Sequence, residues 1–321
     1  MLRVQIPNAH PSLAIDFPEL RIGCAEYPEG PTGVTVFHFA SRVFGAVDCR
    51  GASPATSLTD VLRMNYGRFV NAIVFSGGSA YGLEAASGVA ARLLSSGQAS
   101  ARWDGIAIVP GAVVFDFRGR SNSIHPDHSL GAAALDAARE GIFPLGPYGA
   151  GRFVHCGKLA GEEFMERAGQ GAAFRQYGST KLAVFTVVNA VGCIVDRSGA
   201  VVRGNRDASG VRLGLEEIRR LGRRNPTPSV EDQERGGNTT LTLVVTNRDM
   251  TQAELQALAV QTHTSMARAI QPFHTTRDGD TLFAVTTGDD RSAYPTLGDL
   301  YLEACDLAWT AVLNCAAAGS S

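Results

Sequence analysis

The sequence contains no apolar run of the roughly 18–20 residues that a membrane-spanning helix requires. The segment from Met1 to Phe17 lacks a basic stretch followed by an apolar stretch, the pattern of a secretory signal. The six cysteines are far apart and form no CxxC pair, which in a chain of 321 residues indicates buried thiols in a reducing compartment. We therefore expect a cytoplasmic protein that makes no contact with membranes.

Charge is also scarce. Charged residues make up 19 % of the chain and the formal net charge is −2, so the basic surface needed for nucleic-acid binding is not predicted. Apolar residues make up 45 %, enough for a large core in one large domain or two small ones. The 36 glycines show no fixed period, which indicates many tight turns and excludes a collagen-like repeat. Composition therefore indicates a globular α/β enzyme.

Short β-branched segments bounded by Gly, Pro, Asn or Asp predict strands, and Ala- and Leu-rich segments predict helices. Several of the strands are apolar without alternation, which is typical of sheets covered on both faces. The predicted strands are residues 34–39, 43–47, 72–75, 106–109, 113–117, 182–188, 193–195, 241–246 and 281–287. The predicted helices are residues 83–94, 130–139, 251–270 and 300–317.

One segment, residues 214–238, differs from the rest of the chain. It is rich in charge, contains Pro226 and Pro228, and has few large apolar side chains. This composition predicts an exposed helix end followed by a linker. The linker leads through Gly236 and Gly237 directly into a strongly apolar strand.

The junction between linker and strand is Asn238-Thr239. A threonine hydroxyl becomes a useful nucleophile when its residue is the first of a chain, because its own α-amine then serves as the base. Thr239 could create that N-terminus itself, by attacking the carbonyl carbon of Asn238 and converting the peptide to an ester that water hydrolyses. Mobile glycines before the bond and a rigid strand after it suit such a cut. An ordinary turn is the alternative interpretation of this junction.

Other motifs are incomplete. Residues 77–82 resemble a nucleophile elbow, but Tyr81 stands where the motif needs glycine. Residues 151–158 resemble a phosphate-binding loop with one residue too many. His125, Asp127 and His128 predict a polar turn rather than a metal site, because no further ligand cluster is near in sequence. The sequence therefore predicts neither a metal nor an organic cofactor.

Eight stretches, in order over nearly the whole chain, resemble the self-processing N-terminal-nucleophile hydrolases that include the D-aminopeptidases and β-aminopeptidases. Within that family the chain is similar to the nylon-oligomer hydrolases, which are 6-aminohexanoate-oligomer endohydrolases. The stretches are residues 29–36, 77–84, 112–117, 169–175, 201–205, 237–240, 270–275 and 278–287.

The resemblance implies a four-layer αββα sandwich, an α/β (α+β) fold in which residues 1–321 form a single domain. It also implies a cut between Asn238 and Thr239 that gives fragments 1–238 and 239–321, with residues 214–238 as the tail before the cut. The expected assembly is a homotetramer of processed heterodimers.

The same resemblance assigns roles to five residues. Thr239 would be the nucleophile for self-cleavage and turnover, and Lys158 would help to keep its new amine neutral. Asn189 would donate to the oxyanion, while Asp278 and Asp280 would orient Thr239 and balance the lysine charge. Without the resemblance, these residues suggest a surface lysine, a strand-end asparagine and an Asp-Gly hairpin turn.

Phe115 marks a departure from the family, because the related hydrolases carry a tyrosine there whose hydroxyl faces the active site. Phe115 keeps the ring and loses that hydrogen bond, which affects rate and substrate preference more than reaction type. We expect Phe115 and Tyr81 to line the pocket; the alternative for Phe115 is a core aromatic in a strand.

Three functions follow for the chain as a whole. The first is hydrolysis inside linear amide oligomers of the 6-aminohexanoate type, or of similar aliphatic amides, through an acyl-enzyme on Thr239. The alternative is an aminopeptidase that releases N-terminal β- or D-amino acids. The third is an uncut scaffold protein in which Thr239 stays internal. The first two differ in whether the pocket demands a free substrate amine.

Overall fold

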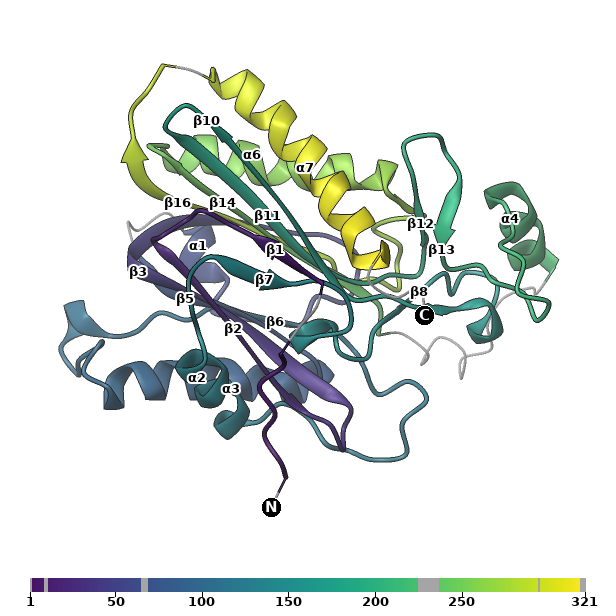
Figure 1. The fold of residues 1–321 in the computed structure, drawn as a ribbon, viewed down its shortest axis with the longest axis horizontal. Helices are drawn as coiled ribbons and strands as arrows, with labels where there is room; N and C mark the ends of the chain where they lie inside the picture. The colour runs from purple at the N-terminus through teal and green to yellow at the C-terminus, as the bar shows by residue number, and fades with distance from the viewer. Residues whose placement is uncertain (1, 9–10, 65–68, 225–236, 294, 318–321) are drawn as a thin grey trace.

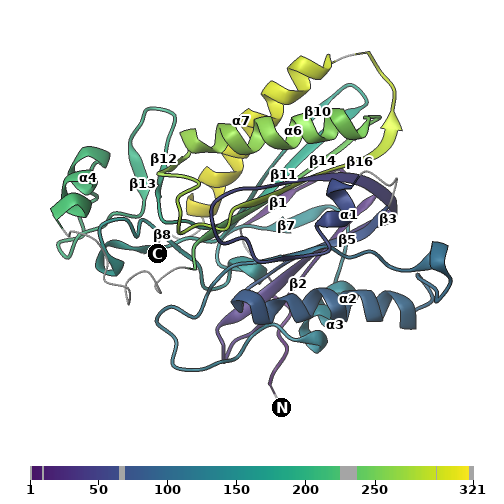
Figure 2. The same cartoon turned by 180° about the vertical axis from the view of Figure 1, so that it is seen from behind.

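The computed structural model describes residues 2–8, 11–64, 69–224, 237–293 and 295–317. Two β-sheets lie face to face in the middle of the molecule, and a pair of helices covers the outer face of each (Figures 1 and 2). The layers are therefore helix, sheet, sheet and helix, as the resemblance implies.

The two sheets share one long strand, β3 (Thr32–Cys49). Its first half pairs with β2 (Leu20–Tyr27) and β5 (Val70–Ser76), and its second half pairs with β16 (Thr281–Asp290). The sequence predicts two strands here, because the apolar pattern breaks at residues 40–42. That break marks an irregularity in the pairing of β3 with β5, between His38 and Val43, rather than a turn.

The first sheet continues from β5 to β6 (Gly111–Val113) and β4 (Thr56–Ser57). The second sheet runs from β10 (Gln170–Tyr177) through β11 (Thr180–Asn189) and β14 (Thr239–Arg248) to β16 and β3. Strands β14 and β16 are parallel, whereas β11 is antiparallel to β14. The C-terminal end of β11 therefore lies beside the N-terminal ends of β14 and β16, at one end of the strands of the second sheet.

Helices α2 (Glu84–Ser95) and α3 (His128–Asp136) pack on the first sheet, and α6 (Gln252–Ser265) and α7 (Leu297–Ala317) pack on the second. The capping box of Thr251 and Glu254 that the sequence predicts opens α6. Aromatic rings fill the space between the sheets, where they bury the largest apolar surfaces of the core. These rings belong to Phe37, Phe75, Phe143, Phe185 and Phe283.

Shorter elements surround the layers: β1 (Ser12–Ala14), α1 (Asp60–Arg63), β7 (Ile142–Pro144), β8 (His155–Cys156), β9 (Glu166–Arg167), β12 (Cys193–Val195), β13 (Val201–Arg203), α4 (Leu215–Arg224) and β15 (Ile270–Gln271). Helix α4 lies at the edge of the molecule, beyond β12 and β13 (Figure 1). It confirms the predicted exposed helix at the start of residues 214–238. The predicted linker at residues 225–236 lies outside the described residues.

Several predicted elements are wrong. Residues 106–109 form no strand. The N–H of Ile108 donates to the side-chain oxygen of Asn71, and the N–H of Asn71 donates to the carbonyl of Ile108, so no regular strand pairing forms there. The strand predicted at 113–117 ends at Val113, where the chain leaves the sheet. Strands β2 and β10 were missed because small or polar residues interrupt their apolar pattern.

Two predicted helices are too long. The helix predicted at 130–139 ends at Asp136, and the one predicted at 251–270 ends at Ser265. A 3₁₀ turn follows the second helix, and strand β15 begins at Ile270. Within the described residues, no helix is both long and apolar enough to cross a membrane.

The packed aromatic rings between the sheets give a test of the core. Phe37 lies on the shared strand, fully buried, with ring centroids 5.0 Å from Phe185 and 5.2 Å from Phe75. Phe37→Ala removes contacts between both sheets and leaves a cavity, so we expect the free energy of unfolding to fall by ~3–5 kcal/mol. Urea denaturation measures the change. Leu302→Ala, at a side chain that is 65 % exposed, is the control and should change stability by less than ~0.5 kcal/mol. A similar loss in both variants would contradict this description of the core.

Candidate active site

The residues that the sequence singles out come together where β11 ends and β14 and β16 begin. The register of β11 and β14 places Asn189 opposite Thr239, and a parallel bridge joins Asn238 to Asp278. Lys158 reaches the same place from the loop after β8, where its backbone N–H donates to the carbonyl of Val191. Every one of these side chains is buried, with at most 6 % of its residue surface exposed.

The structure shows which groups contact the Asn238–Thr239 bond in the uncut chain. The Thr239 hydroxyl donates a hydrogen bond to the Asn238 carbonyl oxygen at 2.6 Å. The N–H of Gly279 donates to the same oxygen at 2.8 Å. A donor held against a carbonyl oxygen stabilises the negative charge that develops there when a nucleophile attacks. The backbone of Gly279 is therefore ready to support an oxyanion at the Asn238 carbonyl.

Sequence reasoning missed this role of Gly279. A Cβ added to Gly279 would lie 2.2 Å from the carbonyl oxygen of Ser53, so only glycine fits this close approach. The glycine between two aspartates was the available signal. The hairpin-turn interpretation of that stretch is wrong, because it leads into β16, which pairs with β14 and β3 and not with the preceding segment.

Lys158 is no surface residue. Its Nζ atom donates to the backbone oxygen of Asn189 at 3.0 Å, to Oδ1 of Asn189 at 2.9 Å and to Oδ1 of Asn238 at 2.9 Å. Three oxygen acceptors match the three N–H groups of an ammonium. Burial, with the nearby guanidinium of Arg118, lowers the pKa of Lys158 to about 7. The lysine therefore sits close to its point of proton loss at neutral pH.

Asn189 links the lysine to the chain before the Asn238–Thr239 bond. Its Oδ1 accepts from Lys158 and from the N–H of His155, and its Nδ2 donates to the carbonyl oxygens of Phe115 at 2.9 Å and Gly237 at 3.1 Å. This amide thus binds the carbonyl one residue upstream of the Asn238 carbonyl.

Asp278 is fully buried among donors. One carboxylate oxygen accepts from the N–H of Val191 at 3.2 Å, and the other accepts from the N–H of Thr275 at 2.9 Å and from its hydroxyl. Burial, together with the charge of Asp280, raises the pKa of Asp278. This carboxyl group therefore resists ionisation more than an ordinary aspartate.

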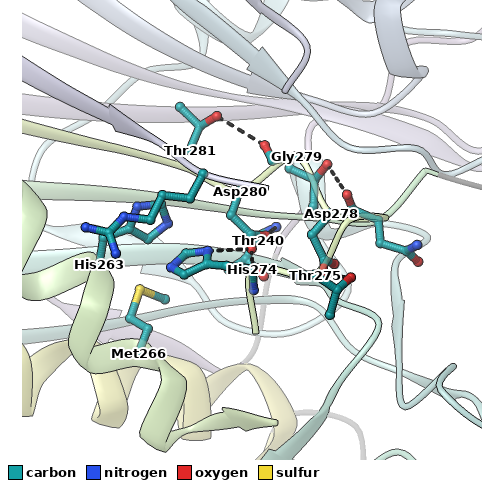
Figure 3. Close-up of polar contacts among 12 residues, drawn as sticks. Thr240, His263, Met266, His274, Thr275, Asp278, Gly279, Asp280 and Thr281 are labelled. Carbon is teal, nitrogen blue, oxygen red and sulfur yellow. Dashed lines mark hydrogen bonds and ion pairs between the residues drawn. The ribbon is translucent and has the colours of Figure 1, made fainter. Parts of the chain in front are cut away.

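Asp280 holds the residue after Thr239. Its Oδ1 accepts from the N–H of Thr240 at 2.6 Å, and its Oδ2 accepts from the backbone N–H and from Nδ1 of His274 at 3.2 and 2.9 Å (Figure 3). Sequence reasoning missed His274 and Thr275. Both lie in residues 270–275, one of the stretches that carry the family resemblance.

Phe115 lies directly against Gly237, in the segment before the Asn238–Thr239 bond. Gly237 has a positive φ of 94°, and a Cβ there would come within 2.5 Å of the Phe115 ring. The ring of Phe117 contacts Phe115 on one side and Tyr81 on the other, with centroids 5.7 and 6.4 Å apart. Tyr81 is 69 % exposed. Of the two predicted pocket residues, Phe115 therefore adjoins the site and Tyr81 lies at the surface.

The described residues contain no cluster of three or more His, Cys, Asp or Glu side chains arranged to hold a metal ion. Asp127, one of the candidate ligands, instead caps helix α3. Its Oδ1 accepts from the N–H of Leu130 at 2.9 Å and from the hydroxyl of Tyr27 at 2.8 Å.

Relatives of known sequence extend over most of the chain. Residues 14–319 match peptidase family S58. The chain is 44 % identical over 278 residues to a 6-aminohexanoate-oligomer endohydrolase of Paenarthrobacter ureafaciens, covering 86 % of this chain and 75 % of that protein. It is 36 % identical over 272 residues to an uncharacterized aminopeptidase of Mycobacterium leprae, covering 80 % of this chain and 71 % of the other.

Solved structures show the same fold at low identity. A β-aminopeptidase of Burkholderia sp. superposes with a TM-score of 0.65 at 17 % identity. The L-aminopeptidase D-Ala-esterase/amidase of Ochrobactrum anthropi, described as a variant of the Ntn hydrolase fold, gives 0.65 at 16 % identity. Each match covers 98 % of this chain and 89 % of the other.

These matches confirm the predicted N-terminal-nucleophile fold and the family resemblance. The chain belongs to peptidase family S58, and it is an amide-bond hydrolase with the N-terminal-nucleophile hydrolase fold.

Proposed function

We propose that this protein is a self-processing hydrolase whose N-terminal threonine, Thr239, cuts inside linear aliphatic amide oligomers of the 6-aminohexanoate type. The observation that carries the proposal is the Thr239 hydroxyl on the Asn238 carbonyl, with the Gly279 N–H on the same oxygen. The name of the Paenarthrobacter relative, an endohydrolase of such oligomers, supports the substrate class.

In self-cleavage, Thr239 Oγ1 attacks the carbonyl carbon of Asn238, and the Gly279 N–H stabilises the oxyanion. The C–N bond breaks, and the proton of the hydroxyl passes to the leaving nitrogen. Asn238 is then held as an ester on Oγ1. The α-amine of Thr239 is now free, and water hydrolyses the ester to give a carboxylate on Asn238 and to regenerate the Thr239 hydroxyl.

Turnover repeats the same chemistry on a substrate amide. The free amine of Thr239 takes the proton of its own hydroxyl, which attacks the substrate carbonyl and forms an acyl-enzyme. The amine product leaves after taking up a proton, and water hydrolyses the ester. The ammonium of Lys158, held at the same strand ends, disfavours a second positive charge on the Thr239 amine, so that the amine stays a base.

The ester of self-cleavage and the acyl-enzyme of turnover differ only in their acyl group. The substrate acyl chain should therefore occupy the position that Gly237 and Asn238 hold in the uncut chain. Donors line it: Lys158 Nζ faces Oδ1 of Asn238, and Asn189 Nδ2 faces the carbonyl of Gly237. Neutral carbonyl oxygens suit these donors better than a substrate ammonium does. This favours cutting within an oligomer over the alternative, an aminopeptidase of β- or D-residues.

Both fragments would remain one fold after the cut. Strands β14 and β16, from residues 239–321, lie between β11 and β3, from residues 1–238. Separating the fragments would break two strand pairings and open the apolar core. We therefore infer that the mature enzyme is a tight complex of fragments 1–238 and 239–321.

The first test concerns self-cleavage. We expect the purified protein to run as two fragments that co-elute on gel filtration, with Thr239 as the new N-terminus. Thr239→Ala, which lacks the nucleophile, should remain one chain without activity, and Thr239→Ser should still cut. Gel electrophoresis, intact mass and N-terminal sequencing measure these outcomes. Normal cleavage of Thr239→Ala would indicate an outside protease and overturn the proposal.

The second test separates internal from terminal cutting. We expect a linear 6-aminohexanoate oligomer to yield shorter oligomers before monomer accumulates, because the acyl site accommodates a chain with further amides. An N-acetylated oligomer, which has no free amine, should be cut with kcat/KM within about threefold of the unblocked one, a difference of less than ~1 kcal/mol. Mass spectrometry of early products provides the measurement. Monomer released from the start, and no reaction of the blocked oligomer, would favour the aminopeptidase.

The third test uses Lys158. Its pKa is lowered from 10.5 to about 7 in the folded chain, so the unfolded chain binds more protons between these values. The lysine's contribution to the free energy of unfolding therefore rises with pH through that window. Two uncut proteins are compared, Thr239→Ala and Thr239→Ala/Lys158→Met. From about pH 7 to about pH 9, the free energy of unfolding of the first should rise by about 2 kcal/mol more than that of the second. Urea denaturation at both pH values measures the difference, and a constant gap would contradict the lowered pKa.

A further inference from the structure

We infer that His274 is a positioning residue of this hydrolase: its ring holds the Asp280 carboxylate against the N–H of Thr240 and thereby fixes the nucleophile, Thr239. The inference rests on the proposed function of Thr239. Its starting point is the pair of hydrogen bonds from His274 to one oxygen of Asp280 (Figure 3).

The backbone of His274 is held in an uncommon conformation. Its φ is +56°, a left-handed region that few residues other than glycine adopt. In this conformation both the backbone N–H and ring Nδ1 reach Oδ2 of Asp280. Strained backbone of this kind persists where the surroundings enforce it, and it is concentrated at functional sites. Here the strained residue directs both of its donors to one buried carboxylate.

The tautomer of His274 follows from its partner. Oδ2 of Asp280 accepts from the backbone N–H of His274, and the same oxygen as acceptor for the ring places the proton on Nδ1. The opposite nitrogen, Nε2, is buried and has no hydrogen-bond partner among the residues that the structure describes. A buried polar atom without a partner costs free energy. A residue needed only to fill space would avoid that cost with an aliphatic side chain, so we ascribe the ring to the donor that it offers Asp280.

Neighbouring rings fix the orientation of the His274 imidazole. The His263 ring lies edge-on at 4.4 Å and 86°, and the Phe273 ring lies 3.9 Å away. Nδ1 of His263 bonds to Oδ2 of Asp48 at 2.9 Å. Burial, despite Asp48, lowers the pKa of His263 to about 4. His263 therefore stays neutral near pH 7 and packs against His274 without charge repulsion.

The consequence reaches the nucleophile through Asp280. One oxygen of its carboxylate is fixed by His274, so the other stays on the N–H of Thr240, at the second residue of β14. Without the ring donor, the buried carboxyl group of Asp280 would lose one of its hydrogen bonds, beside an Asp278 whose pKa is raised by burial and by Asp280. The start of β14 would then be held less firmly. Small misplacements of a reacting group cost far more in rate than in binding.

The experiment compares His274→Leu, which removes the ring donor, with His274→Asn, whose Nδ2 can take the place of Nδ1 and which tolerates positive φ. We expect His274→Leu to lower kcat by roughly ten- to a hundredfold, with KM changed by less than about threefold. His274→Asn should recover most of kcat. The exposed His128, on α3 beyond the first sheet, gives the matched control: His128→Leu should behave as wild type.

Two further measurements keep the inference testable. If His274→Leu fails to fold, His274→Gln replaces it: its donor is one bond farther from the backbone, so its kcat should stay low while His274→Asn is active. In an Asp280→Asn background, removing the ring should have little additional effect. Equal kcat in wild type and in the Leu or Gln variant overturns the positioning role, as does failure of His274→Asn to recover activity. An uncut, inactive wild-type protein would instead refute the proposed function of Thr239.

Discussion

The pairing of β14 between β11 and β16 is the constraint on which the site depends. Pairing with β11 sets Thr239 opposite Asn189, and the bridge beside β16 brings Asp278 and Gly279 to the bond before Thr239. The backbone ladders are rigid and their register is set by the buried faces of the strands. A bond placed at this edge is therefore held among donors by the same hydrogen bonds that build the sheet.

Burial of charge gives this edge its chemistry. Lys158, Asp278 and Asp280 are all removed from water, and each is compensated by hydrogen bonds rather than by solvent. Burial lowers the pKa of the lysine towards neutrality and raises the pKa of Asp278. Groups whose pKa values are shifted in this way are typical of catalytic sites, because proton transfer near pH 7 becomes accessible to them. The half-buried His274 and the buried His263 extend the same network behind β14.

Local patterns predicted the elements where sequence and tertiary contacts agree. The β-branched runs of β11, β14 and β16 and the capping box of α6 were predicted because local propensity, apolar pattern and packing all favour the same structure there. Strands β2 and β10 were not predicted, because their small and polar residues break the apolar pattern and are suited to contacts that only the tertiary structure shows. The shared strand β3 was predicted as two strands, because the apolar pattern breaks at an irregularity in its pairing with β5 and not at a turn.

The sequence by itself determined the family, the layered fold and the identity of Thr239, Lys158, Asn189, Asp278 and Asp280 as candidate site residues, because the motifs that carry them are local and contiguous. Only the tertiary structure decided how they meet. It placed the backbone N–H of Gly279 on the Asn238 carbonyl oxygen, directed the Asn189 amide to the Gly237 carbonyl, and placed His274 against Asp280. These contacts join strand ends that are far apart in sequence, and their geometry depends on register and burial, which no local pattern encodes.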